Sequence, residues 1–475
     1  MLFPTTDFAI FFAVVFLAHW LLNPFRTRWK VFMILASYVF YAWWDWHLVW
    51  ILSVVTVLGQ TGALLVARQE GERARRVALT VAVTATLAPL LWFKYYGFLS
   101  LNLENLFGAF GASSPLPLMQ FVLPVGISFY TFMAVSYIVD VYRGDLEPGP
   151  WLDFFVYLSF FPHLVAGPIV RGGELLPQFR RARDPRRLDL AGNAYLILGG
   201  LFKKVVISSY LAATIVDPVF GDPARFGAID VLFAIYAYAI VIYADFSGYT
   251  DIAIGVAGLL GFRFPQNFDR PYTARSVQDF WRRWHMTLSR WLRDYLYIPL
   301  GGSRKGERRT YINLMITMVL GGLWHGAGWT FLAWGALHGA GLAYDHWRTS
   351  KRAVAGLDPL PDDPRSVLLQ RVATFHFVCL GWVFFRAESF GVAFRVLGRL
   401  LFGWTVGPAL VGPVLLLVIA GSLLMQYLPH HPARHLQVAF SRLRPWAQGV
   451  GIALGLAAIT TLGPQGVAPF IYFQF

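Results

Sequence analysis

The stretch Tyr311–Tyr344 reads YINLMITMVLGGLWHGAGWTFLAWGALHGAGLAY and holds no Asp, Glu, Lys or Arg in its 34 residues. As one straight helix it would be ~51 Å long, whereas the hydrocarbon core of a bilayer is ~30 Å thick. Glycines interrupt it near the middle, and we therefore expect a broken helix packed deep inside a membrane bundle. The four glycines assigned to the break are Gly321, Gly322, Gly326 and Gly328.

His325 lies in that break. An ionisable side chain at membrane depth indicates a functional site, and neighbouring glycines let a substrate approach the backbone closely. A histidine also titrates in the range needed to take a proton from a hydroxyl, as acyl transfer from a thioester to an alcohol requires. The alternative is that His325 only caps a broken helix end and that the glycines only serve helix packing.

A second histidine interrupts the apolar stripe of the segment Asp279–Tyr297, which reads DFWRRWHMTLSRWLRDYLY. At helical spacing, Trp281, His285 and Leu288 fall on one face, which predicts one amphipathic helix lying at the membrane interface. His285 is then either part of a reaction centre or a core histidine that is hydrogen-bonded to a neighbouring carbonyl.

Basic residues gather on the opposite face of this predicted helix and in the loop that follows it. They are either charges that face lipid headgroups or a cytoplasmic cradle for a phosphorylated donor, since arginine matches phosphate oxygens with paired donors. The candidates for donor binding are Arg282, Arg283, Arg290, Arg293, Arg304 and Lys305.

Composition extends the membrane assignment to the whole chain. Of its 475 residues, 57% are hydrophobic and 14% are charged, whereas soluble domains usually carry about 25% charged residues. Several further runs lack charge altogether, and a span needs ~20 mostly apolar residues. These runs are Phe8–Leu22, Phe121–Val139, Val231–Ala244 and Val411–Leu428.

Placing the basic clusters between the apolar runs on the cytoplasmic side gives an all-α polytopic bundle of about 12 crossings, with the N-terminus outside. We expect one membrane domain over residues 1–475, with a motif core at 121–346 and no cleavable signal peptide. The run Trp151–Pro168 contains the helix breakers Pro162, Gly167 and Pro168. It is predicted to be a re-entrant segment whose irregular backbone is satisfied by surrounding protein.

Several classes of site are disfavoured. The single Cys379 excludes a disulfide framework, and the scattered histidines lack metal-ligand spacing, so no metal site is predicted. The G-x-S-x-G elbow and the P-loop are absent. The net charge of +14 is explained by cytoplasmic loops that face anionic lipid, without a nucleic-acid partner.

Longer motifs carry a resemblance to a known family. RSVQDFWRRWHMTLSRWLRDYLYIPLGGSRKG and GGLWHGAGWTFLAWGALHG, supported by FFPHLVAGPIVRGGELLPQF and YADFSGYTDIAIGVAGLLGFRFPQNFDRPY, resemble the membrane-bound O-acyltransferase (MBOAT) family. The similarity runs from about residue 3 to residue 390 and is closest to the bacterial branch of alginate O-acetylation membrane proteins.

The resemblance implies a helical bundle around a tunnel in which two histidines meet. His325 matches the family's catalytic histidine and His285 its second active-site position, with Trp324 and Asp245 in supporting roles. Asp245 has an alternative role as a packing carboxylate within the bundle. The donor implied is acetyl-CoA, used as a substrate, with no permanently bound cofactor.

These features predict a bacterial inner-membrane acetyltransferase that moves acetyl outward for O-acetylation of an exported polysaccharide such as alginate. Cellulose or another surface polymer, or D-alanyl transfer to teichoic acid, remain alternatives within the family. A lipid-linked sugar or polysaccharide transporter is the rival from another class, although the internal repeats and paired charges typical of transporters are not visible. The outside loops are short, so the polymer is predicted to be acetylated by a separate extracytoplasmic acyltransferase.

Overall fold

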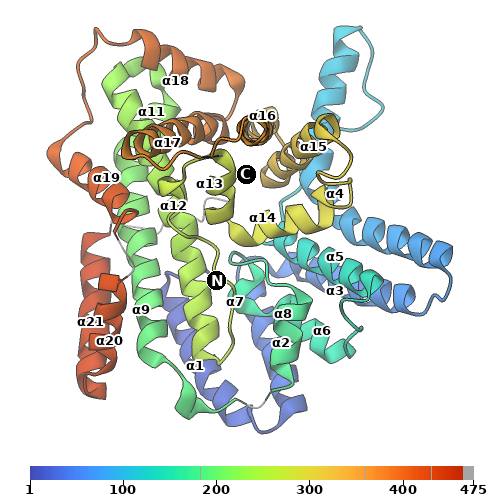
Figure 1. The fold of residues 1–475 in the computed structure, drawn as a ribbon. Helices are drawn as coiled ribbons and strands as arrows, with labels where there is room; N and C mark the ends of the chain where they lie inside the picture. Colours follow the sequence, from blue (N-terminus) through green and yellow to red (C-terminus); the bar gives the residue numbers. More distant parts are fainter. Residues whose placement is uncertain (182, 359, 429–430, 464–475) are drawn as a thin grey trace. The chain divides into compact units, whose positions relative to one another are not determined.

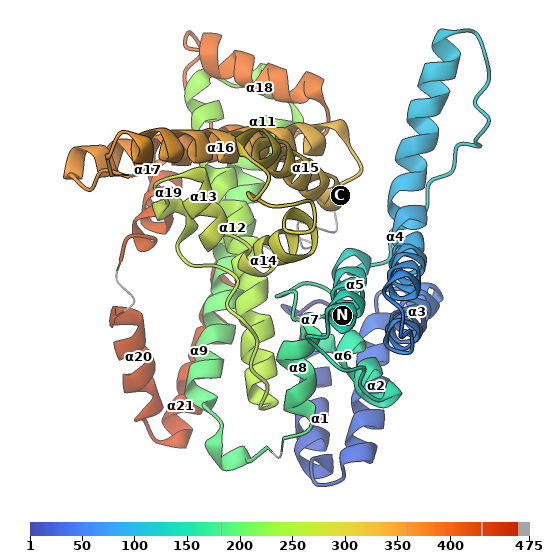
Figure 2. The same ribbon diagram turned by 45° about the vertical axis from the view of Figure 1, so that its right-hand side comes forward.

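The computed structural model describes residues 1–181, 183–358, 360–428 and 431–463, and every regular element within them is helical. The predicted all-α class is thereby confirmed. Internal contacts divide the chain into two compact units, one formed by residues 1–193 with 252–265 and the other by residues 194–251 with those from 266 onward. Figures 1 and 2 show the helices of both units in two views.

The first unit contains most of the N-terminal helices. Helix α3 packs against both α4 and α5, and a methyl group added at Gly62 of α3 would come within 2.7 Å of the Ala82 side chain on α4. The α3–α4 crossing is therefore too close for any larger residue at position 62. The helices are α1 (Thr6–Leu22), α2 (Arg26–Ala42), α3 (Val49–Ala67), α4 (Glu72–Ala109), α5 (Ile127–Arg143), α6 (Trp151–Ser159), α7 (Phe161–Leu164) and α8 (Gly172–Phe179).

The predicted re-entrant run is broken where its sequence indicates. Helix α6 ends at Ser159, the short α7 ends at Leu164, and residues 165–171 continue without helix. Protein groups satisfy this buried backbone: the Phe161 N–H donates to Ser37 Oγ at 3.1 Å, and the Tyr157 hydroxyl donates to the Val170 carbonyl at 2.9 Å. The first unit thus supplies internal hydrogen-bond partners for this irregular backbone, as a re-entrant segment would require.

The second unit carries the two histidine motifs. Helix α15 packs along α16, and α16 in turn packs against α17, which Figure 2 shows in orange and brown. Helices α9 and α12 are shared with the first unit but lie mostly in the second. The helices are α9 (Leu190–Leu201), α10 (Ser209–Leu211), α11 (Asp217–Gly221), α12 (Ala228–Leu259), α13 (Val277–Arg283), α14 (Met286–Leu292), α15 (Glu307–His325), α16 (Trp329–Val354), α17 (Pro364–Arg386), α18 (Phe390–Phe402), α19 (Pro413–Met425), α20 (His431–Ser441) and α21 (Pro445–Leu462).

Among the described residues, six helical stretches are long and apolar enough to cross a bilayer, and α1 and α19 are shorter apolar helices. The chain is therefore a membrane protein with multiple spans. The six stretches are Trp46–Ala67, Glu72–Ala109, Leu190–Gly221, Ala228–Leu259, Pro364–Arg386 and Pro445–Leu462.

Candidate active site

His325 is the last residue of α15 and is buried, with 3% of its surface exposed. Three aromatic rings surround its imidazole, with centroids 5.0 Å away at Trp324, 4.9 Å at Trp334 and 5.1 Å at Phe385. Tilted and edge-on contacts of this kind hold a ring in one orientation and exclude water from it. The predicted intramembrane histidine therefore lies in an aromatic enclosure built by α15, α16 and α17.

The glycines of the motif have two different roles, close helix packing and the helix break, whereas the sequence prediction assigned all four of them to the break. Gly321 and Gly322 lie inside α15 and do not form the break, which is a correction to the expectation. A methyl group at Gly322 would collide with the Phe331 backbone, and one at Gly335 would collide with the Met318 carbonyl. These glycines allow α15 and α16 to pack backbone against backbone.

The break itself lies at residues 326–328, between α15 and α16. Gly326 and Gly328 are extended, with φ values of −159° and −160°, which any residue can adopt. Glycine is required at 326 for another reason, because a side chain there would enter the ring of Phe331. The break thus places His325 at a buried helix end that is packed tightly by its neighbours.

His285 lies at a second break, and this corrects the predicted continuous helix over Asp279–Tyr297. Helix α13 ends at Arg283, α14 begins at Met286, and a π-helical turn follows at Arg293–Tyr297. His285 itself has φ 41°, a left-handed conformation that costs a non-glycine residue about 1–3 kcal/mol. Local helical periodicity could not reveal this bend.

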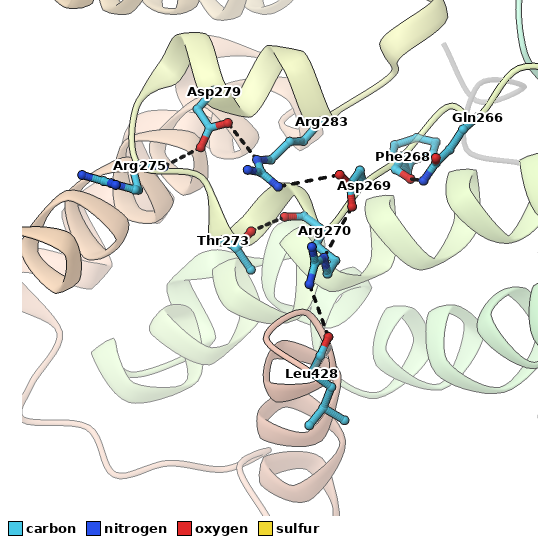
Figure 3. Close-up of polar contacts among 9 residues, drawn as sticks. All are labelled: Gln266, Phe268, Asp269, Arg270, Thr273, Arg275, Asp279, Arg283 and Leu428. Atoms are coloured by element: carbon cyan, nitrogen blue, oxygen red, sulfur yellow. Dashed lines mark hydrogen bonds and ion pairs between the residues drawn. The ribbon is translucent and has the colours of Figure 1, made fainter. Parts of the chain in front are cut away.

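Residues 267–269 form the bend from outside the segment. The backbone N–H of Met286 donates to the Asn267 carbonyl at 2.9 Å, and the N–H of Asp269 donates to the Arg283 carbonyl at 2.9 Å. The Asp269 carboxylate also lies 3.8 Å from the Arg283 guanidinium, which pairs with Asp279 at 2.8 Å (Figure 3). The backbone groups at the end of α13 and the start of α14 are therefore hydrogen-bonded to the neighbouring loop of residues 267–269.

The His285 imidazole is fully buried. Its ring centroid lies 4.6 Å from that of Phe246 and 6.0 Å from that of Trp324. Trp324 therefore contacts both predicted histidines, His285 by its ring and His325 as its chain neighbour. His285 lies outside the six candidate spans, and burial holds the pKa of its imidazole below the ordinary value. The side chain is then neutral, with one nitrogen that donates and one that accepts a proton.

A pocket of about 450 Å³ lies beside the second break. Three predicted donor-binding residues line it, namely Arg282, Arg290 and Arg293. Its apolar wall includes Met286, the residue after His285, and Met318, about 10 Å along α15 from His325. The pocket thus gathers guanidinium groups from the end of α13 (Arg282) and from the end of α14 and the turn after it (Arg290 and Arg293), next to apolar side chains.

The other three basic candidates lie elsewhere. Arg283 is engaged by Asp279 and Asp269 and does not line the pocket. Arg304 and Lys305 are exposed in the loop between Tyr297 and α15 and do not line it either. The structure therefore brings together half of the predicted basic face.

Comparison with known proteins adds the family. The sequence pattern of the membrane-bound O-acyltransferase family matches residues 35–347, a range that contains both histidines and the pocket arginines. The chain belongs to this family. It is accordingly an O-acyltransferase, as the histidine motifs predict.

Individual relatives of this MBOAT protein cover most or all of its length. The protein named probable alginate O-acetylase AlgI from Azotobacter vinelandii is 38% identical over 100% of both chains. The AlgI protein of Pseudomonas aeruginosa is 42% identical over 83% of this chain and 74% of its own. A peptidoglycan O-acetyltransferase from Helicobacter pylori is 34% identical over 84% of this chain and 79% of its own.

Asp245 of this MBOAT chain lies on α12 and forms a buried ion pair with Lys204. Six residues further along α12, Asp251 pairs with Lys203, whose ammonium also donates to Ser247 Oγ at 3.1 Å. This geometry corresponds to the alternative role considered for Asp245, as a packing carboxylate. Its chain neighbour Phe246 contacts the ring of His285.

Sequence reasoning missed the residues that surround the two imidazoles. Trp334 and Phe385 enclose His325, and Phe246 packs on His285. Asn267 escaped notice although it lies in the quoted motif PQNFDRPY. No local signal singled it out, because Gln266, Asp269 and Arg270 are polar neighbours in the same motif.

Proposed function

We propose that this chain takes acetyl from acetyl-CoA on the cytoplasmic side and delivers it across the bacterial inner membrane for O-acetylation of an exported polysaccharide, with alginate as the first candidate. The observation that carries this proposal is the similarity to AlgI of Azotobacter vinelandii, which extends over the full length of both chains. A match of that extent covers the site as well as the fold.

In this reaction His325 is the essential group. As a general base, its imidazole takes the proton of the acceptor hydroxyl while the oxygen attacks the thioester carbonyl; the C–S bond then breaks and coenzyme A leaves as the thiol with that proton. As an acyl carrier, the imidazole nitrogen itself attacks the carbonyl, the C–S bond breaks, and coenzyme A leaves as the thiol with the ring proton. The acceptor hydroxyl then attacks the acetyl group, and its proton returns to the imidazole. His285 orients or assists His325, and Trp324 contacts both rings.

The donor's phosphates are assigned to the arginine pocket. Arg282, Arg290 and Arg293 line it, and charge-assisted bonds from guanidinium groups suit phosphate oxygens. The apolar wall at Met286 and Met318 suits the uncharged pantetheine arm and thioester. Arg283, Arg304 and Lys305 contribute at most to the field around the entrance.

The membrane arrangement proposed is the predicted one of about twelve crossings around a tunnel. The six long apolar stretches and the two shorter apolar helices support several of these crossings, and the α15–α16 hairpin is charge-free over most of its length. The tunnel would connect the arginine pocket with the outer face.

A partner on the outer face completes the proposal. The segment between α4 and α5 spans only residues 110–126, and a hydrated polysaccharide does not fit among apolar helices. A separate extracytoplasmic acyltransferase must then receive the acetyl group and transfer it to the polymer.

The test is expression in an alginate-producing bacterium that lacks its own membrane acetylase, with polymer acetylation measured chemically. Restored alginate acetylation supports the proposal, and its loss in His325→Ala ties it to this site. Acetylation of peptidoglycan without acetylation of alginate would show that peptidoglycan is the acceptor polymer. The peptidoglycan O-acetyltransferase of Helicobacter pylori is the relative that favours this alternative. Restored alginate acetylation in cells that lack every extracytoplasmic acyltransferase would show that no such partner is needed.

A further inference from the structure

Asn267 stands out as a buried amide in direct contact with His285. It is 1% exposed and lies on the loop before the bend, outside the arginine pocket. Its side-chain oxygen Oδ1 is 3.2 Å from His285 Nδ1, 3.1 Å from the Thr287 backbone nitrogen and 2.9 Å from Thr287 Oγ1. One oxygen thus faces three groups from both sides of the α14 start.

The backbone N–H of Thr287 settles which way this amide points. A backbone N–H can only donate, so the atom that faces it must be the amide oxygen and not the NH₂ group. The amide nitrogen then faces Thr250 and donates to its hydroxyl oxygen at 3.5 Å. The usual ambiguity between amide oxygen and nitrogen is therefore removed by the chain itself.

The orientation of Asn267 decides the proton position on His285. Because the amide oxygen only accepts, the His285 Nδ1 that faces it must carry a hydrogen. In a neutral imidazole the basic lone pair then belongs to Nε2. The same residue also holds the left-handed bend, since its carbonyl accepts from the Met286 N–H at 2.9 Å.

We propose that Asn267 is a positioning residue that fixes both the bend and the Nδ1–H tautomer of His285, so that Nε2 is the nitrogen presented to the reaction centre. Asn267 does not line the donor pocket, and it acts through His285. This inference rests on the proposed role of His285 in acetyl transfer, but the tautomer it assigns can be measured without any turnover.

The experiment compares the full chain with Asn267→Ala, Asn267→Asp and Thr287→Val, each reconstituted in lipid bilayers. Histidine is labelled with ¹⁵N in the ring, and the His285 signals are assigned by subtraction of a His285→Gln spectrum. The nitrogen shifts report which ring atom carries the proton. Wild type is expected to show protonated Nδ1 and unprotonated Nε2 at His285.

Asn267→Ala is expected to lose that tautomer preference and to lower kcat of acetyl transfer about 10- to 100-fold, the loss typical of groups that orient a reactive histidine. KM for acetyl-CoA should stay unchanged, because Asn267 does not line the pocket. Asn267→Asp keeps an acceptor in place and should retain the Nδ1–H tautomer and more activity than the alanine variant.

Thr287→Val is the matched control, since it removes one donor from the same oxygen and leaves the His285 contact. It should retain the wild-type tautomer and lose less kcat than Asn267→Ala. An Nε2–H tautomer in wild type, an unchanged tautomer in Asn267→Ala, or an aspartate variant no better than alanine would overturn the assignment. Absence of acetyl-CoA turnover in wild type would contradict the proposed function instead, while the spectra still test Asn267.

Discussion

The two histidines lie at two helix breaks that are made in opposite ways. The break after His325 is crowded with glycines, and its own sequence shows that the helix must end there. The break at His285 contains no glycine, adopts φ 41° and is held by residues 267–269 from a separate loop. The first break is determined by its own sequence, and the second by tertiary contacts. A buried imidazole lies at each of them.

This difference shows how the two positions should respond to change. The His325 position depends on close backbone packing between α15 and α16, so it is sensitive to added volume. The His285 position depends on hydrogen bonds from Asn267 and Asp269, so it is sensitive to lost partners. The predictions below separate these two kinds of dependence.

The largest effect is expected for His325→Ala, which removes the imidazole and leaves the fold. Loss of a general base lowers the rate about 10²- to 10⁴-fold, and loss of an obligatory acyl carrier lowers it further. Polymer acetylation is the measurement, with membrane levels of the protein determined in parallel. Near-normal acetylation at normal protein levels would contradict the assignment of His325.

Gly335→Ala tests the volume dependence of the α15–α16 break. The added methyl group meets the Met318 carbonyl, and overpacking of this kind destabilises by about 1–3 kcal/mol. The measurement is thermal unfolding of the purified chain in detergent.

Gly398→Ala in α18 is the control for that experiment, because nothing lies within 4 Å of the added methyl group. Alanine at an open helical position should stabilise by about 0.5–1 kcal/mol. Equal unfolding temperatures for the two variants would show that the α15–α16 contact is looser than the structure indicates.

The pocket beside the second break gives a smaller effect. Arg290→Ala removes one guanidinium from the pocket wall and should raise KM for acetyl-CoA about tenfold with little change in kcat, as loss of one charge-assisted hydrogen bond does. Arg304→Ala is the matched control, since Arg304 is exposed and outside the pocket. If KM rises equally in both variants, the assignment of the donor site to the pocket alone is contradicted, and the loop that carries Arg304 also contributes to donor binding.

The smallest effect concerns sidedness. Ser303, exposed in the loop that joins the two histidine motifs, is replaced by Cys in a Cys379→Ala background. The protein should remain active and should react with a membrane-impermeant thiol reagent only after the cells are opened. Labelling of intact cells from outside would reverse the whole predicted topology.

The sequence was informative where the physics is local. A charge-free run of 34 residues with glycines at its centre predicts a hairpin with His325 at the break, because backbone geometry and polarity act within the run. The helix break around Pro162 was recognisable for the same reason. The common location of Arg290 and Arg293, three residues apart at the end of α14, likewise follows from helical spacing.

Other features arise from partners distant in the sequence. The bend at His285 needs Asn267, and the removal of Arg283 from the pocket needs Asp269 and Asp279. Asn267 and Asp269 lie outside the segment Asp279–Tyr297, so the periodicity of that segment predicts an unbroken helix on which all the arginines are equivalent. The enclosure of His325 by Trp334 and Phe385 depends on two further helices in the same way.

The paired lysines of the second unit have a consequence for biogenesis. Lys203 and Lys204 lie within the candidate span Leu190–Gly221, and their carboxylate partners Asp251 and Asp245 lie within Ala228–Leu259. A single lysine at the centre of a helix opposes insertion by about 2.5–3.5 kcal/mol. The first of these helices therefore carries an uncompensated penalty as it leaves the ribosome, and the second relieves it. We expect the translocon to release the two helices into lipid together, as one neutralised hairpin.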